Sequence, residues 1–204
     1  HFDHSFELEE SLAAKGKDEA LHLVKDMLHN PGSVFYVRQQ QPAGLGHAVW
    51  CARHLVGSEP VAILLADDLI LGASCMKEMI DAYRGGNMVA VMDVPHEQTG
   101  SYGIVTPGAD DGRIVQVEGL VEKPDPSSAP SNIAVVGRYI VTPEVFETLA
   151  AKEHGAGGEI QLTDALAKQI GKAPFSGVRF SGERFDCGSK LGFLQANVAF
   201  GLKN

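Results

Sequence analysis

The sequence contains few cysteines. Its 204 residues include three, at positions 51, 75 and 187, and no Cys-x-x-Cys pair. An odd number of scattered cysteines argues against a disulfide framework and against a structural zinc site, and it is typical of proteins whose thiols stay reduced in a cytosol. We therefore expect a cytoplasmic protein without disulfide bonds.

Long apolar runs and basic residues are also scarce. The longest apolar runs, such as residues 61–66, are far shorter than the roughly 20 residues of a membrane-spanning helix. There are 17 Lys and Arg against 26 Asp and Glu, which gives a formal net charge of −9. Nucleic acids and anionic membranes would be repelled, so we expect neither as a partner. A phosphate-bearing ligand would need a local lysine, backbone N–H groups or a metal ion.

Two kinds of catalytic motif are missing as well. No Gly-x-Gly-x-x-Gly follows a first predicted strand, which argues against a dinucleotide-dependent dehydrogenase. No Ser/His/Asp or Cys/His arrangement suggests a nucleophile. The sequence therefore does not indicate covalent catalysis.

The apolar content is sufficient for one sizeable core. Residues of the apolar classes make up 44% of the chain, which favours a single domain. Strands are predicted at 34–37, 61–65, 88–94, 114–121, 134–142 and 178–180, and helices at 8–28 with a break at Gly16, 47–55, 74–83, 143–151, 159–170 and from 189 onward. Alternating strands and helices predict an α/β fold with a mixed, mainly parallel sheet flanked by helices. The continuous apolar run 61–65 predicts a strand buried on both faces.

Two glycines, Gly44 and Gly46, precede a predicted helix. Such glycines let the backbone approach a ligand and aim helix N-terminal N–H groups at it, although a Gly-x-Gly pair alone is more often an ordinary turn. Gln39 could offer its amide to the edge of a base, or it could be an ordinary surface residue. His47 shows no metal-ligand spacing and is interpreted as structural.

Two carboxylates are candidates for binding a cation. Asp67 comes directly after the run 61–65, at the carboxyl end of a strand, where ligand sites of open α/β sheets lie. Its oxygens suit Mg²⁺, although a turn or a helix cap explains it about as well. Asp68 would point elsewhere and is the more structural of the two. Asp186, before Cys187 and Gly188, alone is best explained by a helix N-terminus, but paired with Asp67 it becomes a second metal ligand.

The tripeptide Glu122-Lys123-Pro124 ends a predicted strand, because proline cannot continue a central ladder. A surface ion pair in a turn is the common explanation for this sequence. The functional alternative is that Glu122 accepts hydrogen bonds from sugar hydroxyls while Lys123 binds a phosphate.

Three further positions could approach a sugar. Gly103 and Gly137 lie in predicted strands, where they either let backbone amides reach a ligand or form bulges. Glu159 follows a Gly-rich loop and opens the helix predicted at 159–170. The helix dipole alone would explain an acid at that place.

The order and spacing of these motifs resemble the bacterial UTP:glucose-1-phosphate uridylyltransferase family. The resemblance rests on Arg38-Gln39, Gly44-Leu45-Gly46-His47-Ala48-Val49, Ala66-Asp67-Asp68, Ser101-Tyr102-Gly103, Val121-Glu122-Lys123-Pro124, Val136-Gly137-Arg138-Tyr139, Gly157-Gly158-Glu159-Ile160-Gln161-Leu162-Thr163-Asp164 and Asp186-Cys187-Gly188. It covers most of the chain. Thymidylyltransferases for glucose-1-phosphate share the Glu-Lys-Pro but have Thr where Cys187 stands.

The resemblance implies a nucleotide-diphospho-sugar transferase fold of the glycosyltransferase-A-like type. It implies formation of UDP-glucose and pyrophosphate from UTP and glucose-1-phosphate, by direct in-line attack on the α-phosphorus of UTP, with Mg²⁺ as cofactor and a homodimer or homotetramer as the assembly. The residues it assigns are Gln39 and Gly44 to uracil, Gly103, Glu122, Gly137 and Glu159 to glucose, Lys123 to phosphate, and Asp67 and Asp186 to Mg²⁺, with Lys123 and Asp67 as the catalytic pair.

The start of the sequence departs from the family. Members begin with a first strand and a Gly-rich loop that cradles the triphosphate, whereas this sequence starts at a point inside the usual domain. We therefore expect residues 1–204 to form a single nucleotidyltransferase domain that is incomplete at its N-terminus. Two alternatives stay open: a non-catalytic sugar-nucleotide-binding module or fragment, and a pyrophosphorylase that uses another nucleotide such as dTTP.

Overall fold

The computed structural model describes residues 3–203. The chain divides into two compact units, residues 1–38 and 39–204, and each is described by itself. The expectation of a single nucleotidyltransferase domain stays a prediction. Within the described residues, no helix combines the length and the apolar character needed to span a membrane.

The first unit contains two helices separated at Gly16, where the sequence predicted a break. Helix α1 spans Phe6–Ala14 and α2 spans Asp18–Asp26, and the turn between them contains Gly16, whose φ is +62°. The strand predicted at 34–37 is wrong, because this segment pairs with no other strand of the described chain. Its β-branched and aromatic residues are instead exposed, with Tyr36 78% accessible. Strand propensity depends on cross-strand packing, which this segment lacks.

The second unit contains the strands and five helices of the described chain. The strands are β1 (Val61–Leu64), β2 (Asp68–Leu71), β3 (Asn87–Asp93), β4 (Gly103–Asp110), β5 (Ile114–Glu122), β6 (Ile133–Val141), β7 (Phe175–Arg179) and β8 (Glu183–Asp186). The helices are α3 (Leu45–Cys51), α4 (Cys75–Ala82), α5 (Glu144–Ala150), α6 (Leu162–Ala167) and α7 (Lys190–Lys203). Short 3₁₀ turns lie at Arg53–Leu55, His96–Ser101, Pro126–Ser128 and Ala156–Gly158.

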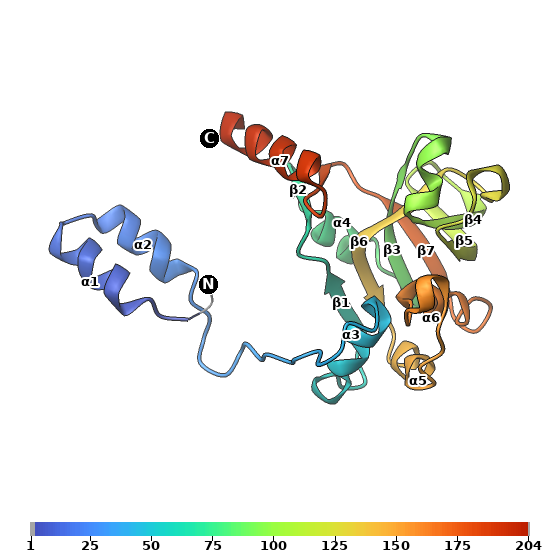
Figure 1. Ribbon diagram of the computed structural model, residues 1–204, viewed down its shortest axis with the longest axis horizontal. Coiled ribbons are helices and arrows are strands. Elements are labelled where there is room, and N and C mark those ends of the chain that lie inside the picture. The colour runs from blue at the N-terminus through green and yellow to red at the C-terminus, as the bar shows by residue number, and fades with distance from the viewer. Residues whose placement is uncertain (1–2, 204) are drawn as a thin grey trace. The chain divides into compact units, whose positions relative to one another are not determined.

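Six strands form the main sheet, in the order β1-β6-β3-β7-β5-β4, and β2 pairs with β8 in a separate ribbon (Figure 1). The mixed sheet flanked by helices is confirmed, but the expectation that it is mainly parallel is wrong. Between the strands of the described chain, only β3 and β7 pair in parallel. Strands β4 and β5 are joined by a short turn, and a short turn permits only antiparallel pairing. A continuous apolar run therefore indicates that a strand is buried, but it does not indicate whether the strand runs parallel or antiparallel to its neighbours.

Helices cover both faces of the sheet (Figure 1). Helices α3, α5 and α6 pack on the face that carries Val89 and Val91 of β3. Helix α4 packs on the opposite face, against Met88 and Ala90 of the same strand. Successive side chains of a strand point to opposite faces, so β3, which is buried on both, is the centre of the core.

Strand β1 lies at an edge of the sheet and pairs only with β6. The prediction that this strand is buried on both faces is wrong, since Leu64 is 54% exposed and burial alternates along the strand. Beyond β1 the chain turns at Asp67 into β2, which brings the predicted carboxylates out of the sheet. The edge position of β1 thus delivers them to the ribbon formed with β8.

Candidate active site

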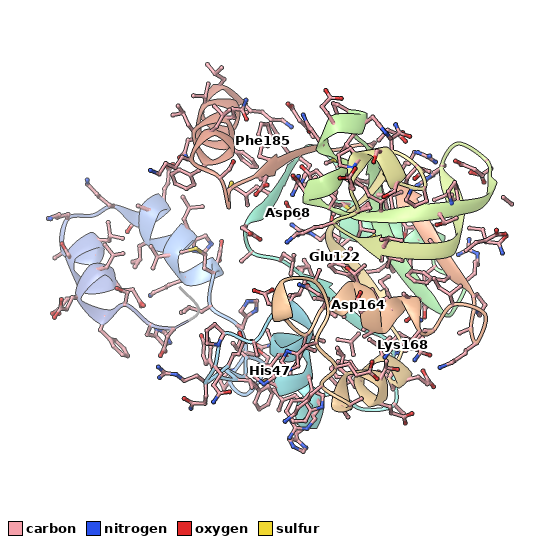
Figure 2. The ribbon with its side chains drawn as sticks, turned by 45° about the vertical axis from the view of Figure 1, so that its right-hand side comes forward. His47, Asp68, Glu122, Asp164, Lys168 and Phe185 are labelled. Carbon is pink, nitrogen blue, oxygen red and sulfur yellow. The ribbon has the colours of Figure 1, made fainter. Side chains whose placement is uncertain are left out.

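A cavity of about 300 Å³ opens beside the ribbon β2–β8 and the main sheet. Its walls include Asp68 and Glu122, which are labelled in Figure 2. Six of the nine residues singled out in the sequence line it, namely Asp67, Gly103, Glu122, Lys123, Gly137 and Asp186. Segments that are far apart in sequence thus meet at one place. The other three, Gln39, Gly44 and Glu159, lie in a neighbouring group around the start of α3.

The carboxylates of Asp67 and Asp186 face the same small space. A Cβ added at Gly188 would lie 3.1 Å from Asp67 Oδ2 and 3.0 Å from Asp186 Oδ1. The backbone fixes this approach, because the N–H of Cys187 donates to the carbonyl of Asp67 at 2.8 Å. Within the described chain, no hydrogen bond or ion pair engages the Asp67 carboxylate. Asp186 Oδ1 accepts the N–H of Gly188 at 3.0 Å and keeps a second lone pair, so the two acids together offer oxygen donors to a cation.

Asp68 has a different environment from its neighbour Asp67. It is 4% exposed, and its Oδ2 accepts the N–H of Gly137 at 2.6 Å. Its Oδ1 accepts Nε of Arg184 at 2.6 Å and also pairs with a terminal nitrogen of that guanidinium. A buried carboxylate with two such partners is part of the framework, which agrees with the structural role predicted for Asp68.

Arg184 connects several parts of the cavity wall. Besides Asp68, its guanidinium lies 3.8 Å from Asp186 Oδ2 and donates to the hydroxyl of Tyr102 at 3.2 Å. Burial opposes its charge, but the nearby Asp68 carboxylate and the bonds to Tyr102 and Asp68 raise the pKa of Arg184 above its usual value. Arg184 therefore stays cationic.

Sequence reasoning missed Arg184 as a part of the site. An arginine two residues before Asp186 resembles any surface cation, and only the pairing of β2 with β8 reveals its partners. Tyr139 was also missed, although it stands within a quoted motif. It lines the same cavity. Burial, followed by the Glu122 and Asp68 carboxylates, raises the pKa of Tyr139, so its hydroxyl keeps its proton.

Glu122 and Lys123 lie at the end of β5. The Glu122 side chain is 12% exposed while that of Lys123 is 53% exposed, and Lys123 Nζ lies 3.9 Å from Glu122 Oε1. The backbone φ of Lys123 is +47°, a left-handed conformation that is uncommon for a non-glycine residue. Its N–H donates to the carbonyl of Tyr102 at 2.9 Å. Such strain persists where the surrounding structure over-determines it, and it clusters at functional sites.

Gly103 and Gly137 leave room that a side chain would remove. Gly103 pairs with Glu122 across β4 and β5, and a Cβ there would lie 3.3 Å from Glu122 Oε2. At Gly137 a Cβ would lie 2.4 Å from Asp68 Oδ2 and 2.8 Å from the Leu65 Cβ, closer than atoms can pack. Gly103 thus leaves space beside the Glu122 carboxylate, whereas Gly137 lets Asp68 and Leu65 pack directly against the strand backbone.

Gln39, Gly44 and Glu159 meet at the start of α3. The φ of Gly44 is +103°, and a Cβ there would lie 2.8 Å from the Glu159 Cβ. The helix predicted to open at Glu159 is wrong, since this residue is extended and α6 begins at Leu162. The backbone of Ile160 is used elsewhere: its N–H donates to the carbonyl of Ala43 at 2.9 Å. The adjacent glycines adopt positive φ, which a helix does not permit.

The described residues contain no group of three or more His, Cys, Asp or Glu arranged to hold a metal. A pair of carboxylates, Asp67 and Asp186, is the oxygen-donor set that the cavity offers. Mg²⁺ is commonly bound through one or two carboxylates, with water and substrate phosphates completing its coordination. The donor chemistry at this place therefore fits magnesium.

The chain is similar to known nucleotidyl transferases. Residues 4–201 match the family described as Nucleotidyl transferase. A UTP–glucose-1-phosphate uridylyltransferase from Komagataeibacter xylinus is 52% identical, over 94% of this chain and 68% of its own length.

Two solved structures have the same fold over the whole chain. A UTP-bound UGPase from Acinetobacter baumannii has a TM-score of 0.88 at 38% identity, with 100% of this chain and 72% of that chain covered. A UDP-glucose pyrophosphorylase complexed with UDP-glucose has a TM-score of 0.86 at 35% identity, with 100% of this chain and 76% of that chain covered. The nucleotide-diphospho-sugar transferase fold expected from the sequence is confirmed.

Proposed function

This chain belongs to the nucleotidyl transferase family, among the UTP–glucose-1-phosphate uridylyltransferases, and from that premise we propose that it forms UDP-glucose and pyrophosphate from UTP and glucose-1-phosphate. The single observation that carries the proposal is the convergence of the Asp67 and Asp186 carboxylates at Gly188, at the cavity that also contains Glu122 and Lys123. An acidic pair beside a lysine suits the joining of two phosphate-bearing substrates.

The reaction is an in-line displacement. A phosphate oxygen of glucose-1-phosphate forms a bond to the α-phosphorus of UTP, and the bond from that phosphorus to the bridging oxygen of pyrophosphate breaks. Both substrates are anionic and the chain carries a net charge of −9. Catalysis therefore rests on alignment and on local positive charge, not on a covalent intermediate.

Asp67 and Asp186 are the proposed ligands of Mg²⁺, which when bound would supply positive charge to the phosphates. The Asp67 carboxylate is exposed, and that of Asp186 is 45% exposed. Both are thus open to an ion that keeps waters and shares substrate oxygens. Asp68 is excluded from this role because Gly137 and Arg184 occupy its oxygens.

Glucose-1-phosphate would occupy the cavity between the ribbon and the sheet. We assign Glu122 to the sugar hydroxyls, and we place Gly103 and Gly137 among the residues that surround the sugar. Glu159 is also assigned to the sugar. Its Oε2 accepts a hydrogen bond from Nε2 of Gln161 at 3.3 Å, and Gln161 lines the cavity. Lys123, half exposed at the rim, is assigned to the phosphate.

The nucleotide end of the site is assigned to Gln39 and Gly44. Leu45, the residue after Gly44, lines the cavity, so the start of α3 adjoins the space proposed for the sugar. The backbone at Gly44 carries no side chain that could keep a base away. A uracil ring beside this segment would lie next to the α-phosphate held near Asp67.

A homodimer or homotetramer is the assembly that we propose. Helix α7 supports this, because five large apolar residues on it are exposed within the described chain: Leu191, Phe193, Leu194, Val198 and Leu202. Light scattering on the purified protein measures the mass of the assembly directly. A mass equal to one chain would contradict the proposal.

The test of function is pyrophosphate release from UTP plus glucose-1-phosphate in the presence of Mg²⁺. Asp67→Asn and Asp186→Asn should each lower kcat by at least about 100-fold, because each removes a charge proposed to bind the metal. Asp81→Asn is the matched control, since Asp81 is exposed and pairs only with Lys77 on α4. Wild-type activity in either site variant would contradict the assignment.

Competition between nucleotides tests the alternatives. Release from dTTP at the same efficiency as from UTP would identify a pyrophosphorylase of another selectivity. Tight binding of UDP-glucose without any turnover would identify a sugar-nucleotide-binding module. UTP-selective release is the result that supports the proposal.

A further inference from the structure

The side-chain amide of Gln39 is oriented by two acceptors. Its nitrogen Nε2 lies 3.1 Å from the carbonyl oxygen of Gly44 and 3.0 Å from Nδ1 of His47. A carbonyl oxygen can only accept, so the atom facing Gly44 must be the NH₂ group. The second hydrogen of that group is then directed at the His47 ring. Both donors of the amide are thereby used inside the protein.

The His47 ring is itself held in place on α3 (Figure 2). Because Nδ1 accepts from Gln39, a neutral ring carries its hydrogen on Nε2, which faces Cys51 Sγ at 3.9 Å. The ring also stacks on Trp50, with centroids 6.0 Å apart. The guanidinium of Arg53 covers the Trp50 ring at 3.5 Å. His47 is therefore a fixed acceptor and not a freely turning surface side chain.

This arrangement leaves Gln39 with one group for a ligand. Among the described residues no donor is bonded to its carbonyl oxygen Oε1. Turning the amide over would place that oxygen against two acceptors, the Gly44 carbonyl and His47 Nδ1. A ligand beside Gln39 therefore meets a hydrogen-bond acceptor in a fixed orientation.

We propose that His47 is a positioning residue that fixes the Gln39 amide with its acceptor available to the nucleobase, and thereby selects uracil over cytosine. Uracil presents an N3–H donor, which Oε1 can accept. Cytosine presents an unprotonated N3, which would face Oε1 acceptor to acceptor. This inference rests on the proposed function, and in particular on the assignment of Gln39 to the base.

The test compares UDP-glucose with CDP-glucose by calorimetric titration of the purified protein. His47→Leu removes the acceptor and should weaken UDP-glucose binding about tenfold, since an oriented hydrogen bond is lost. The preference for UDP-glucose over CDP-glucose should fall by about the same factor, because the Gly44 carbonyl is then the one remaining acceptor that holds the amide, and an amide that turns over loses one hydrogen bond instead of two when it presents its NH₂ group to cytosine. The KM for glucose-1-phosphate should not change.

Two further variants separate orientation from packing. His47→Asn places an amide oxygen near the former position of Nδ1 and should restore the preference for uridine. His47→Gln carries the same chemistry one bond further out and should not restore it. His54→Leu makes the same replacement at an exposed histidine of the 3₁₀ turn Arg53–Leu55, just after α3, and serves as the matched control. Thermal unfolding of each variant identifies any general loss of fold.

The outcomes distinguish the two proposals. A wild-type protein that binds neither sugar nucleotide overturns the proposed function and this inference with it. A wild-type protein that selects uridine, combined with a folded His47→Leu variant of unchanged preference, overturns the role of His47 alone. Parallel loss of preference in the Leu and Gln variants, with recovery in Asn, is the result that we expect.

Discussion

The two ends of the candidate site are built from different kinds of structure. The carboxylate end, made of Asp67, Asp68, Arg184 and Asp186, lies on the paired strands β2 and β8 around a buried ion pair. The base end, made of Gln39, Gly44 and His47, lies on a loop and the first turn of a seven-residue helix. Damage to the first should therefore reduce the stability of the fold, whereas damage to the second should chiefly reduce nucleotide affinity.

Asp68→Asn should break the carboxylate end and give the largest loss of stability. It removes the charge that compensates a largely buried Arg184, and an unpaired buried charge costs roughly 3 kcal/mol or more. Urea unfolding measures the change in the free energy of unfolding. Asp81→Asn, which disrupts only an exposed pair, should change it by less than about 0.5 kcal/mol. Equal effects of the two variants would show that the ion pair at Asp68 is not structural.

Gly44→Ala should damage the base end with a smaller effect on stability. The new Cβ would require a left-handed φ and would lie 2.7 Å from the Ile160 carbonyl oxygen, which together cost about 1–2 kcal/mol. UDP-glucose affinity should fall even under conditions in which the variant is fully folded, because Gly44 is assigned to the base. Gly57→Ala is the matched control, because nothing lies within 4 Å of its Cβ position. Unchanged affinity in Gly44→Ala would remove Gly44 from the base site.

Tyr102→Phe should give the smallest loss of stability of the three variants, and it tests whether the two ends of the site are independent. It deletes only the hydroxyl that accepts from Arg184 at 3.2 Å, and a net hydrogen bond contributes about 1 kcal/mol. Unfolding should register this loss, while UDP-glucose and CDP-glucose should still be discriminated, since Tyr102 does not touch the base end. A changed base preference would mean that the two ends are coupled.

The carboxylate end was the more predictable of the two from sequence. Asp67 lies just beyond the predicted strand at 61–65, at the carboxyl end where ligand sites of open α/β sheets lie, whereas Asp186 was placed at the start of the last helix and became a metal candidate only when paired with Asp67. The preference for Asp67 over Asp68 came from the resemblance to the family, because the local pattern alone does not decide which of two adjacent carboxylates faces a cation. Arg184 was not predicted as a site residue because its partners Asp68 and Tyr102 are 116 and 82 positions away in sequence.

The base end was less predictable, for a physical reason. His47 was interpreted as structural because it shows no metal-ligand spacing. Its bond to Gln39 depends on how the loop 39–44 turns back on α3, which no local pattern indicates. The same limit explains Glu159. A helix was predicted to begin at Glu159, directly after the Gly-rich loop, but the positive φ of Gly157 and Gly158 and the pairing of Ile160 with Ala43 keep this residue extended.

Strand directions and edges also depend on distant pairing. The run at 61–65 is apolar enough for a central strand, yet β1 has a single neighbour. The segment 34–37 has strong strand propensity but no partner in the described chain. Strand propensity thus identified most of the strands. The number of neighbours of each strand and its direction depend on pairing with distant segments.

The backbone conformation of Lys123 sets stability against activity at this position. A φ of +47° costs a lysine about 1 kcal/mol relative to glycine, so heat resistance alone would favour Gly there. A glycine would also remove the ammonium group from the rim of the cavity. A randomised library screened only for survival on heating should drift away from lysine at this codon, whereas one screened for turnover should retain it.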